Sequence, residues 1–118
     1  MSTALETARA FEAAWQSNDL DRARGYLADD MVFTSPFGAD AGVEAAMQQY
    51  AGFAQSVSGP AREIAAFGDD SSALIMSEIA SNLFGKVVSA AHYTVRGGKI
   101  TSELLVYDAS AARGHQPG

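Results

Sequence analysis

The chain has 118 residues, 47% of them hydrophobic, which is enough for one domain with a buried core. Eight Lys and Arg residues against 14 Asp and Glu residues give a formal net charge of -6, so the chain lacks the basic surface that nucleic-acid binding requires. It contains no cysteine, which excludes disulfides, thiolate metal ligands and a cysteine nucleophile. With no signal-peptide pattern and no run of about 18 apolar residues, we expect a cytoplasmic protein without membrane partners.

The first half of the chain predicts three helices. Apolar residues at helical spacing predict a helix over residues 4–16, a short one over residues 18–30 and a third over residues 42–57. Between the second and third, residues 31–37 alternate briefly and stop at Pro36, which is typical of a short strand.

After residue 60 the apolar residues recur with a period of about 2, which predicts strands joined by short turns. The expected strands cover residues 61–68, 72–82, 86–96 and 99–108. This order predicts an α+β fold with three helices packed on one face of an antiparallel sheet. We expect a single domain over residues 1–108 and a flexible tail over residues 109–118, which has no periodicity.

Two segments resemble a known family. These are "NDLDRARGYLADDMVFTSP" (residues 18–36) and "YTVRGGKITSELLVYD" (residues 93–108). With the order of elements, they resemble the nuclear-transport-factor-2-like superfamily over nearly the whole chain, in particular its small polyketide-cyclase-like (SnoaL-like) and ketosteroid-isomerase-like members. The resemblance implies a cone-shaped fold with a curved sheet, a deep apolar cavity and often a dimer through the sheet. It implies no particular reaction, because this fold carries many functions.

Ketosteroid isomerases use a Tyr and a protonated Asp as hydrogen-bond donors and another Asp as the base. The resemblance puts these three roles at Phe11, Ala91 and Ser35. Phe and Ala side chains have no proton to donate, and a lone Ser is not a base at neutral pH. We therefore expect no steroid isomerase chemistry.

Limonene-epoxide-hydrolase-like members use two acids with an Arg between them, and a Tyr and an Asn that help to hold the water. The resemblance puts the acids at Glu78 and Asp108, but Met76 replaces the Arg, Phe33 the Tyr and Ser35 the Asn. Two carboxyl groups in one apolar cavity would raise the pKa of one of them, which supplies an acid and a base at neutral pH.

Polyketide-cyclase-like members commonly use an Asp or a His as general acid, and Asp108 or His92 could serve here. The candidate catalytic residues are therefore Asp108, Glu78 and His92. The ordinary alternatives are a strand-end carboxylate, a paired acid on a strand and a surface imidazole.

The facing of the last two strands depends on the turn between them. Gly97-Gly98 is typical of a two-residue hairpin turn, which would place His92 opposite Glu103, both facing outward, with Asp108 facing inward. A β-bulge would reverse the facing beyond it. The isomerase-like resemblance instead favours Glu103, Leu105 and Tyr107 as the inward-facing residues. The two arguments disagree, so the side that the residues at the far end of this hairpin face is left undecided.

The expected walls of the cavity are mostly large apolar side chains, although ordinary core packing would give the same spacing. They are Phe11, Trp15, Phe33, Ser35, Tyr50, Phe53, Met76 and Tyr93. The two histidines lie too far apart in sequence for a recognisable metal motif, and we expect no metal and no cofactor. The sequence favours a cofactor-free acid–base enzyme, cyclase-like or hydrolase-like, acting on a hydrophobic or polyketide-like molecule, and a homodimer. A non-catalytic ligand-binding or dimerisation module is the alternative.

Overall fold

Three helices and six strands make up the part of the chain that the computed structural model describes, residues 3–82 and 85–108. The helices are α1 (Ala4–Gln16), α2 (Leu20–Arg24) and α3 (Val43–Ser56). The strands are β1 (Leu27–Ser35), β2 (Gly38–Ala41), β3 (Arg62–Gly68), β4 (Ser72–Ser81), β5 (Gly85–Arg96) and β6 (Lys99–Tyr107). The expected α+β fold is confirmed, and the predicted tail at residues 109–118 lies outside the described residues.

The six strands form one curved sheet in the order β2-β1-β6-β5-β4-β3. The predicted purely antiparallel sheet is wrong, because β1 runs parallel to β6 while the other neighbours are antiparallel. A hairpin dictates an antiparallel pair, whereas β1 and β6 are joined by most of the chain and no local turn fixes their direction. Helix α3 follows β1 and β2, so the three helices are not one contiguous N-terminal group.

Each of the first two helices, α1 and α2, begins with a side chain that caps its N-terminus. The hydroxyl of Thr3 accepts a hydrogen bond from the Glu6 backbone N–H at 3.2 Å, and an Asp19 carboxylate oxygen accepts one from the Arg22 N–H at 3.4 Å. The second helix was predicted to reach residue 30, but it ends at Arg24. Residues from Leu27 onward join the sheet instead, since pairing with β6 outweighs the weak helical pattern.

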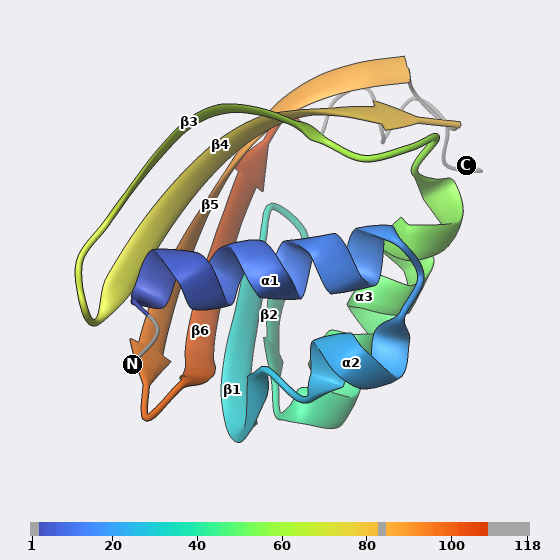
Figure 1. The fold of residues 1–118 in the computed structure, drawn as a ribbon. Helices are drawn as coiled ribbons and strands as arrows, with labels where there is room; N and C mark the ends of the chain where they lie inside the picture. The colour runs from blue at the N-terminus through green and yellow to red at the C-terminus, as the bar shows by residue number, and fades with distance from the viewer. Residues whose placement is uncertain (1–2, 83–84, 109–118) are drawn as a thin grey trace.

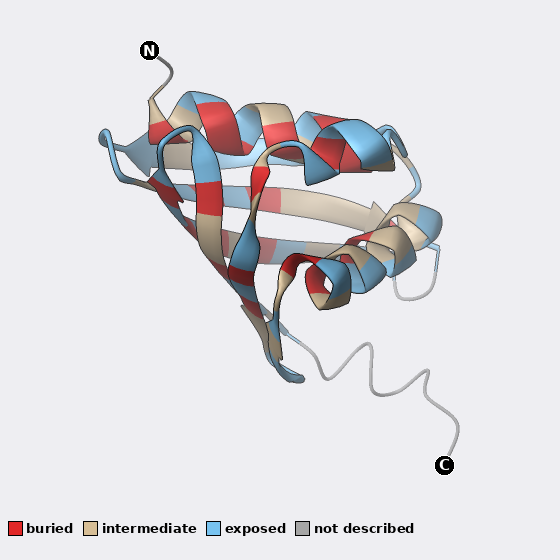
Figure 2. Ribbon diagram, turned by 90° about the horizontal axis from the view of Figure 1, so that it is seen from below, coloured by how far each residue is buried: buried red, intermediate tan, exposed pale blue. Residues whose placement is uncertain are grey.

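Helix α1 lies across the concave side of the sheet, with α2 and α3 toward one end (Figure 1). The buried residues concentrate between these helices and the sheet (Figure 2). At the centre the Phe11 and Tyr50 rings meet edge to face at 4.8 Å between centroids, and Phe33 meets Tyr50 at 5.2 Å. No helix within the described ranges is long and apolar enough to cross a membrane.

The β5–β6 hairpin carries an irregularity that sets the facing of β6. Gly97 and Gly98 both have positive φ, 59° and 76°, as the expected turn requires. The strands pair Val95 with Ile100, but the next pair is Thr94 with Ser102. Thr101 is therefore an extra residue on β6.

This bulge corrects the register that the turn alone predicts. His92 pairs with Leu104 and not with Glu103, and Glu103 pairs with Tyr93. Beyond the bulge every side chain of β6 faces the side opposite to the one expected. Glu103 is consequently buried, with 4% of its surface exposed.

Candidate functional site

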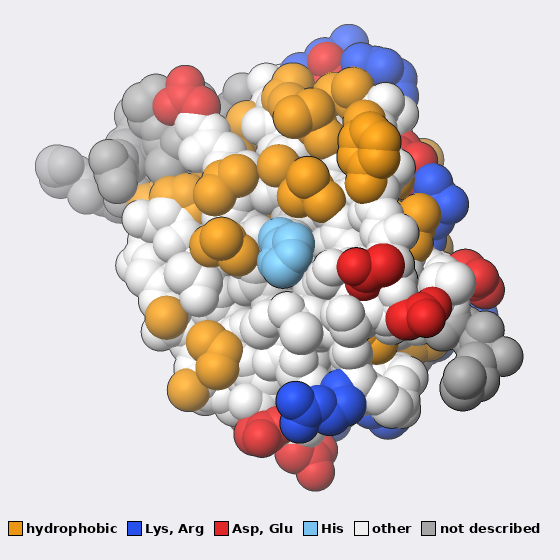
Figure 3. Space-filling model, turned by 90° about the vertical axis from the view of Figure 1, so that its left-hand side faces the viewer, with side chains coloured by type: hydrophobic (Ala, Val, Ile, Leu, Met, Phe, Trp, Pro, Cys, Tyr) orange, Lys and Arg blue, Asp and Glu red, His pale blue; other side chains and the backbone are white. Residues whose placement is uncertain are grey.

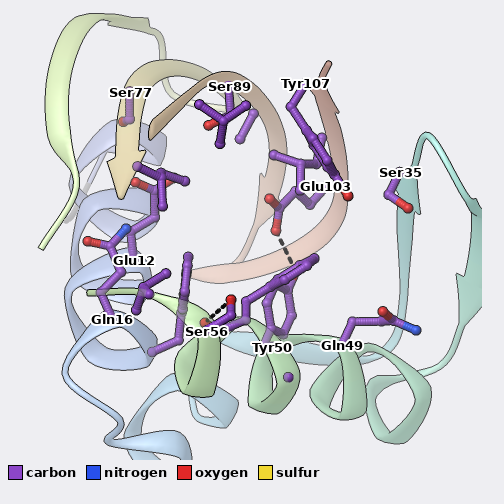
Figure 4. Close-up of a pocket in the computed structure, with 18 of the residues that line it drawn as sticks. Glu12, Gln16, Ser35, Gln49, Tyr50, Ser56, Ser77, Ser89, Glu103 and Tyr107 are labelled. Atoms are coloured by element: carbon purple, nitrogen blue, oxygen red, sulfur yellow. Dashed lines mark hydrogen bonds between the residues drawn. The ribbon is translucent and has the colours of Figure 1, made fainter. Parts of the chain in front are cut away.

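A pocket of about 380 Å³ lies between α1, α3 and the inner face of the sheet. Its volume falls within the roughly 300–1,000 Å³ typical of small-molecule sites. Its walls combine apolar and aromatic side chains with hydroxyl and amide groups (Figure 4). Gln49 and Ser56 of α3 line it, and Glu12 and Glu103 supply its two carboxyl groups.

Glu103 is directed into this pocket from β6 and meets Tyr50 of α3. The Tyr50 hydroxyl donates a hydrogen bond to Glu103 Oε1 at 2.5 Å (Figure 4). Burial raises the pKa of Glu103 to about 8, and the Tyr50 hydrogen bond partly opposes that rise. Burial and the adjacent carboxyl raise the pKa of Tyr50 well above its usual range. Glu103 is therefore largely protonated at neutral pH.

Glu12 reaches the same pocket from α1 and meets Tyr93 of β5. The Tyr93 hydroxyl donates to Glu12 Oε2 at 2.5 Å. Burial raises the pKa of Glu12 to about 7, the Tyr93 hydrogen bond opposes this, and the nearby Glu63 adds to it. Glu12 therefore titrates near neutral pH.

The two acids belong to one cluster. Tyr93 is the cross-strand partner of Glu103 and the hydrogen-bond donor to Glu12, so it lies next to both carboxyl groups. The Glu12 carboxyl group adds to the rise in the pKa of Glu103, because two negative charges in one poorly solvated site repel. The cluster can hold and release protons near neutral pH in apolar surroundings, as acid–base catalysis requires.

Metal binding finds no support in the same region. Among the described residues, no three His, Asp or Glu side chains come together in an arrangement that could hold a metal ion.

The three predicted catalytic residues lie elsewhere. Glu78 forms an ion pair with Arg62 at 3.6 Å and does not line the pocket. His92 is exposed, paired between Leu74 and Leu104. Asp108 follows the end of β6, is exposed and does not line the pocket either.

The eight predicted wall residues divide into three groups. Five of them line the pocket: Trp15, Ser35, Tyr50, Phe53 and Tyr93. Phe11 and Phe33 are fully buried in the core without reaching the pocket surface. Met76 is 38% exposed on the other side of the sheet.

Glu12 and Glu103 were not among the predicted catalytic residues, although weak signals pointed to both. Glu12 stands four residues after the buried Ala8 and three before the buried Trp15, which puts it at the edge of the buried stripe of α1. Glu103 was one of the residues that the isomerase-like resemblance favours as inward. No local sequence pattern predicts the bulge at Thr101, which determines the side of the sheet that Glu103 faces.

The comparisons with known proteins agree with this fold. The family model for the SnoaL-like domain matches residues 8–103. The chain matches none of the curated proteins with which it was compared. A crystal structure from Kribbella flavida is 29% identical, with a TM-score of 0.92 over 98% of this chain and 94% of that one.

Two more distant structures share the fold. A putative polyketide cyclase from Sinorhizobium meliloti is 20% identical, with a TM-score of 0.75 over 84% of this chain and 92% of that one. A protein with a ketosteroid-isomerase-like fold from Catenulispora acidiphila, in complex with trimethylamine, is 20% identical, with a TM-score of 0.78 over 97% and 93%. Since the family model spans most of the chain and these structures share its architecture, the chain belongs to the SnoaL-like family of the nuclear-transport-factor-2-like superfamily.

Proposed function

We propose that this protein is a cofactor-free enzyme that performs acid–base chemistry on a hydrophobic or polyketide-like small molecule. The observation that carries the proposal is the pair Glu12 and Glu103, each hydrogen-bonded to a tyrosine hydroxyl inside one largely apolar pocket. These two glutamates take the place of the sequence-based candidates Asp108, Glu78 and His92, which do not line the pocket.

The pKa order suggests the roles. Glu103, with a pKa near 8, is the general acid, and Glu12, with a pKa near 7, is the general base. Tyr50 fixes the position of Glu103, and Tyr93 fixes that of Glu12. Apolar walls exclude water and hold the substrate in one orientation, which contributes to the rate without further functional groups.

A cyclase-like reaction would proceed as follows. Ionised Glu12 removes a proton from a carbon that lies between two carbonyl groups. That carbon then forms a bond to the carbon of a third carbonyl group elsewhere in the substrate. Glu103 donates its proton to the carbonyl oxygen, which becomes a hydroxyl group. Glu12 is then protonated and Glu103 ionised, and one proton passes back from Glu12 to Glu103 by way of Tyr93 or water to restore the starting state.

A hydrolase-like reaction on an epoxide uses the same two groups. Glu103 protonates the epoxide oxygen as its bond to carbon breaks. Glu12 takes a proton from the water whose oxygen forms the new bond to that carbon. The product is a diol, and the same proton return restores the acids.

The test combines turnover with titration. A panel of hydrophobic epoxides and β-polycarbonyl compounds is offered to the protein and to the Glu103→Gln, Glu12→Gln and Glu78→Gln variants. We expect Glu103→Gln and Glu12→Gln each to lower kcat/KM by about 100-fold or more, the usual size of an acid–base contribution. Glu78→Gln makes the same substitution outside the pocket and should leave the rate unchanged.

A substrate-independent measurement accompanies it. In the ¹³C NMR spectrum of the glutamate carboxyl carbons, two signals should titrate near neutral pH, and each Gln variant should remove one of them. If both carboxyl groups titrate near pH 4.5, or if neither Gln variant slows an accepted reaction, the proposal is wrong.

A non-catalytic binding module of the same fold is the second candidate. The resemblance favours it, because it puts Phe11, Ser35, Met76 and Ala91 where isomerase-like and hydrolase-like relatives carry their functional groups. In that case the pocket would bind members of the panel and release them unchanged, with the two carboxyl groups still titrating near neutrality.

We further propose that the protein is a homodimer that associates through the outer face of the sheet. The cross-strand pairs place a contiguous set of exposed apolar side chains there (Figure 3): Leu74, Met76, Val88, Leu104 and Val106. Glu78, the cross-strand partner of Val88, lies at the edge of this patch and is paired with Arg62. Burial of the patch in a dimer would remove apolar surface from water. The cytoplasmic location stays a prediction from the sequence.

Light scattering after size-exclusion chromatography tests the dimer. Val106→Lys should halve the measured mass, whereas Ala13→Lys, on the exposed side of α1, should leave it at two copies. A wild-type mass of one copy would contradict the proposal.

A further inference from the structure

We infer that the pocket selects organic cations, that is, mainly hydrophobic molecules that carry one protonated or quaternary nitrogen. This rests on the proposed function, because it uses the same two glutamates, and it narrows the substrate class of that site. The inference follows from the charges in the pocket, the character of its walls and the linkage between ligand charge and carboxyl ionisation.

The charges in the pocket are unbalanced. The described residues that line it include two carboxyl groups and no Lys, Arg or His. The hydrogen bonds to Glu12 and Glu103 come from tyrosine hydroxyls, which are neutral. When either glutamate ionises, no positive side chain of the pocket compensates it.

Two cationic side chains, on α1 and β3, form ion pairs outside the pocket. Arg9, one turn before Glu12 on α1, binds both carboxylate oxygens of Glu63, at 3.0 and 2.9 Å. Arg62 pairs with Glu78 at 3.6 Å on the outer side of the sheet. The missing positive charge would therefore have to come from a ligand.

The walls suit an organic cation better than a hydrated metal ion. Trp15 is 6.4 Å from Tyr50 and 6.2 Å from Phe53 between ring centroids, and all three line the pocket. Phe37 and Tyr107, 6.4 Å apart, line it as well. Aromatic rings attract ammonium groups through their negative faces and tolerate their alkyl substituents, which is how quaternary ammonium ligands are recognised elsewhere.

Ligand charge and carboxyl ionisation are linked. A cation beside Glu12 and Glu103 stabilises their ionised forms, which burial otherwise disfavours. Binding therefore releases protons in the pH range where the carboxyl groups are protonated in the free protein and ionised in the complex. The groups facing them are Tyr50 and Tyr93, with Glu63 near Glu12, and none of these supplies a positive charge. Cation affinity should thus rise as pH passes through the pKa values of about 7 and 8, and then level off.

The test compares phenyltrimethylammonium with tert-butylbenzene, which has the same shape and no charge. Neither ligand titrates, so any pH dependence of binding comes from the protein. Trp15 is the single tryptophan of the sequence and lines the pocket, so its fluorescence reports binding of both ligands. At about pH 9 we expect the cation to bind about tenfold more tightly than the hydrocarbon, and at about pH 5.5 we expect that advantage to vanish.

Variants locate the effect. Glu103→Gln and Glu12→Gln should each weaken cation binding at about pH 9 severalfold while leaving tert-butylbenzene binding unchanged, which also shows that the pocket is intact. Glu78→Gln, which removes one charge outside the pocket, should change neither ligand. Equal affinity for the two ligands at high pH, no binding of either, or a cation preference insensitive to both Gln variants would overturn the inference.

The outcome is separable from that of the proposed function. If the cation preference fails while the two carboxyl groups still titrate near neutrality in the NMR experiment, the acid–base site stands and its substrate is uncharged. If the carboxyl groups titrate near pH 4.5, both proposals fail together.

Discussion

The two faces of the sheet place a glutamate in opposite surroundings. On the inner face, Glu103 of β6 is buried, meets the Tyr50 hydroxyl and has a pKa near 8. On the outer face, Glu78 of β4 stays partly in contact with water and pairs with Arg62. The difference teaches that the residue type alone does not set the pKa of a carboxyl group. Removal from water without a compensating positive charge raises that pKa.

The largest expected contrast between the faces is in packing. Ile75 and Met76 are neighbours on β4, yet Ile75 is 2% exposed and Met76 is 38% exposed. Ile75→Ala should lower the free energy of unfolding by about 2–5 kcal/mol, because it leaves a cavity under α1. Met76→Ala, compared in the monomeric Val106→Lys background, should cost less than about 1 kcal/mol. Urea unfolding at neutral pH measures both, and equal losses would remove the distinction between inner and outer face.

The next effect is the pH dependence of stability. Glu12 and Glu103 have folded-state pKa values raised from 4.5 to about 7 and about 8, so the folded state holds their protons more tightly than the unfolded chain does. Their contribution to stability is fully present below pH 4.5 and is lost as pH rises through those folded values. Each proton released costs about 1.4 kcal/mol per pH unit within that window.

Thermal unfolding followed between about pH 6 and pH 9 checks this sign. Asp69 and Glu63, whose pKa values are lowered by hydrogen bonds, remain ionised in this range and do not contribute to the slope. Glu103→Gln should flatten the decline. Stability that rises with pH in wild-type protein would show that the pocket acids are ionised at low cost.

The smallest effect belongs to the outer ion pair. Glu78→Gln should change the free energy of unfolding by about 0–1 kcal/mol, because both partners of the pair are in contact with water. Arg62→Gln should do no more, and the double variant should match either single one. A loss of several kcal/mol in a double-mutant cycle would mean that the outer face also carries a buried charge.

Much of the fold could be predicted from local patterns. The helical periodicity of residues 4–16 and 42–57 correctly predicted α1 and α3, and Gly97-Gly98 correctly predicted the turn between β5 and β6. The parallel pairing of β1 with β6 and the shortening of α2 could not be predicted in this way, since both depend on contacts between distant parts of the chain.

The site was harder to predict than the fold. Aromatic wall residues such as Trp15 and Tyr50 follow from helical spacing. Glu103 depends on one unpaired residue in β6, and alternation along a strand gives the wrong face when a single residue is inserted. Glu12 sits at the edge of a helical stripe, where spacing alone does not decide between solvent and pocket.

The extra residue at Thr101 also affects how relatives of this chain should be aligned. Positions before it keep the alternation set by the turn, and positions after it keep the opposite one. A relative that lacks a counterpart of Thr101 would present Leu104 and Val106 to the ligand and Glu103 to solvent, with no other substitution in β6. A gap-free alignment through this strand would therefore transfer reactive residues to the wrong side of the sheet, so the insertion must be located before any catalytic role is carried from one family member to another.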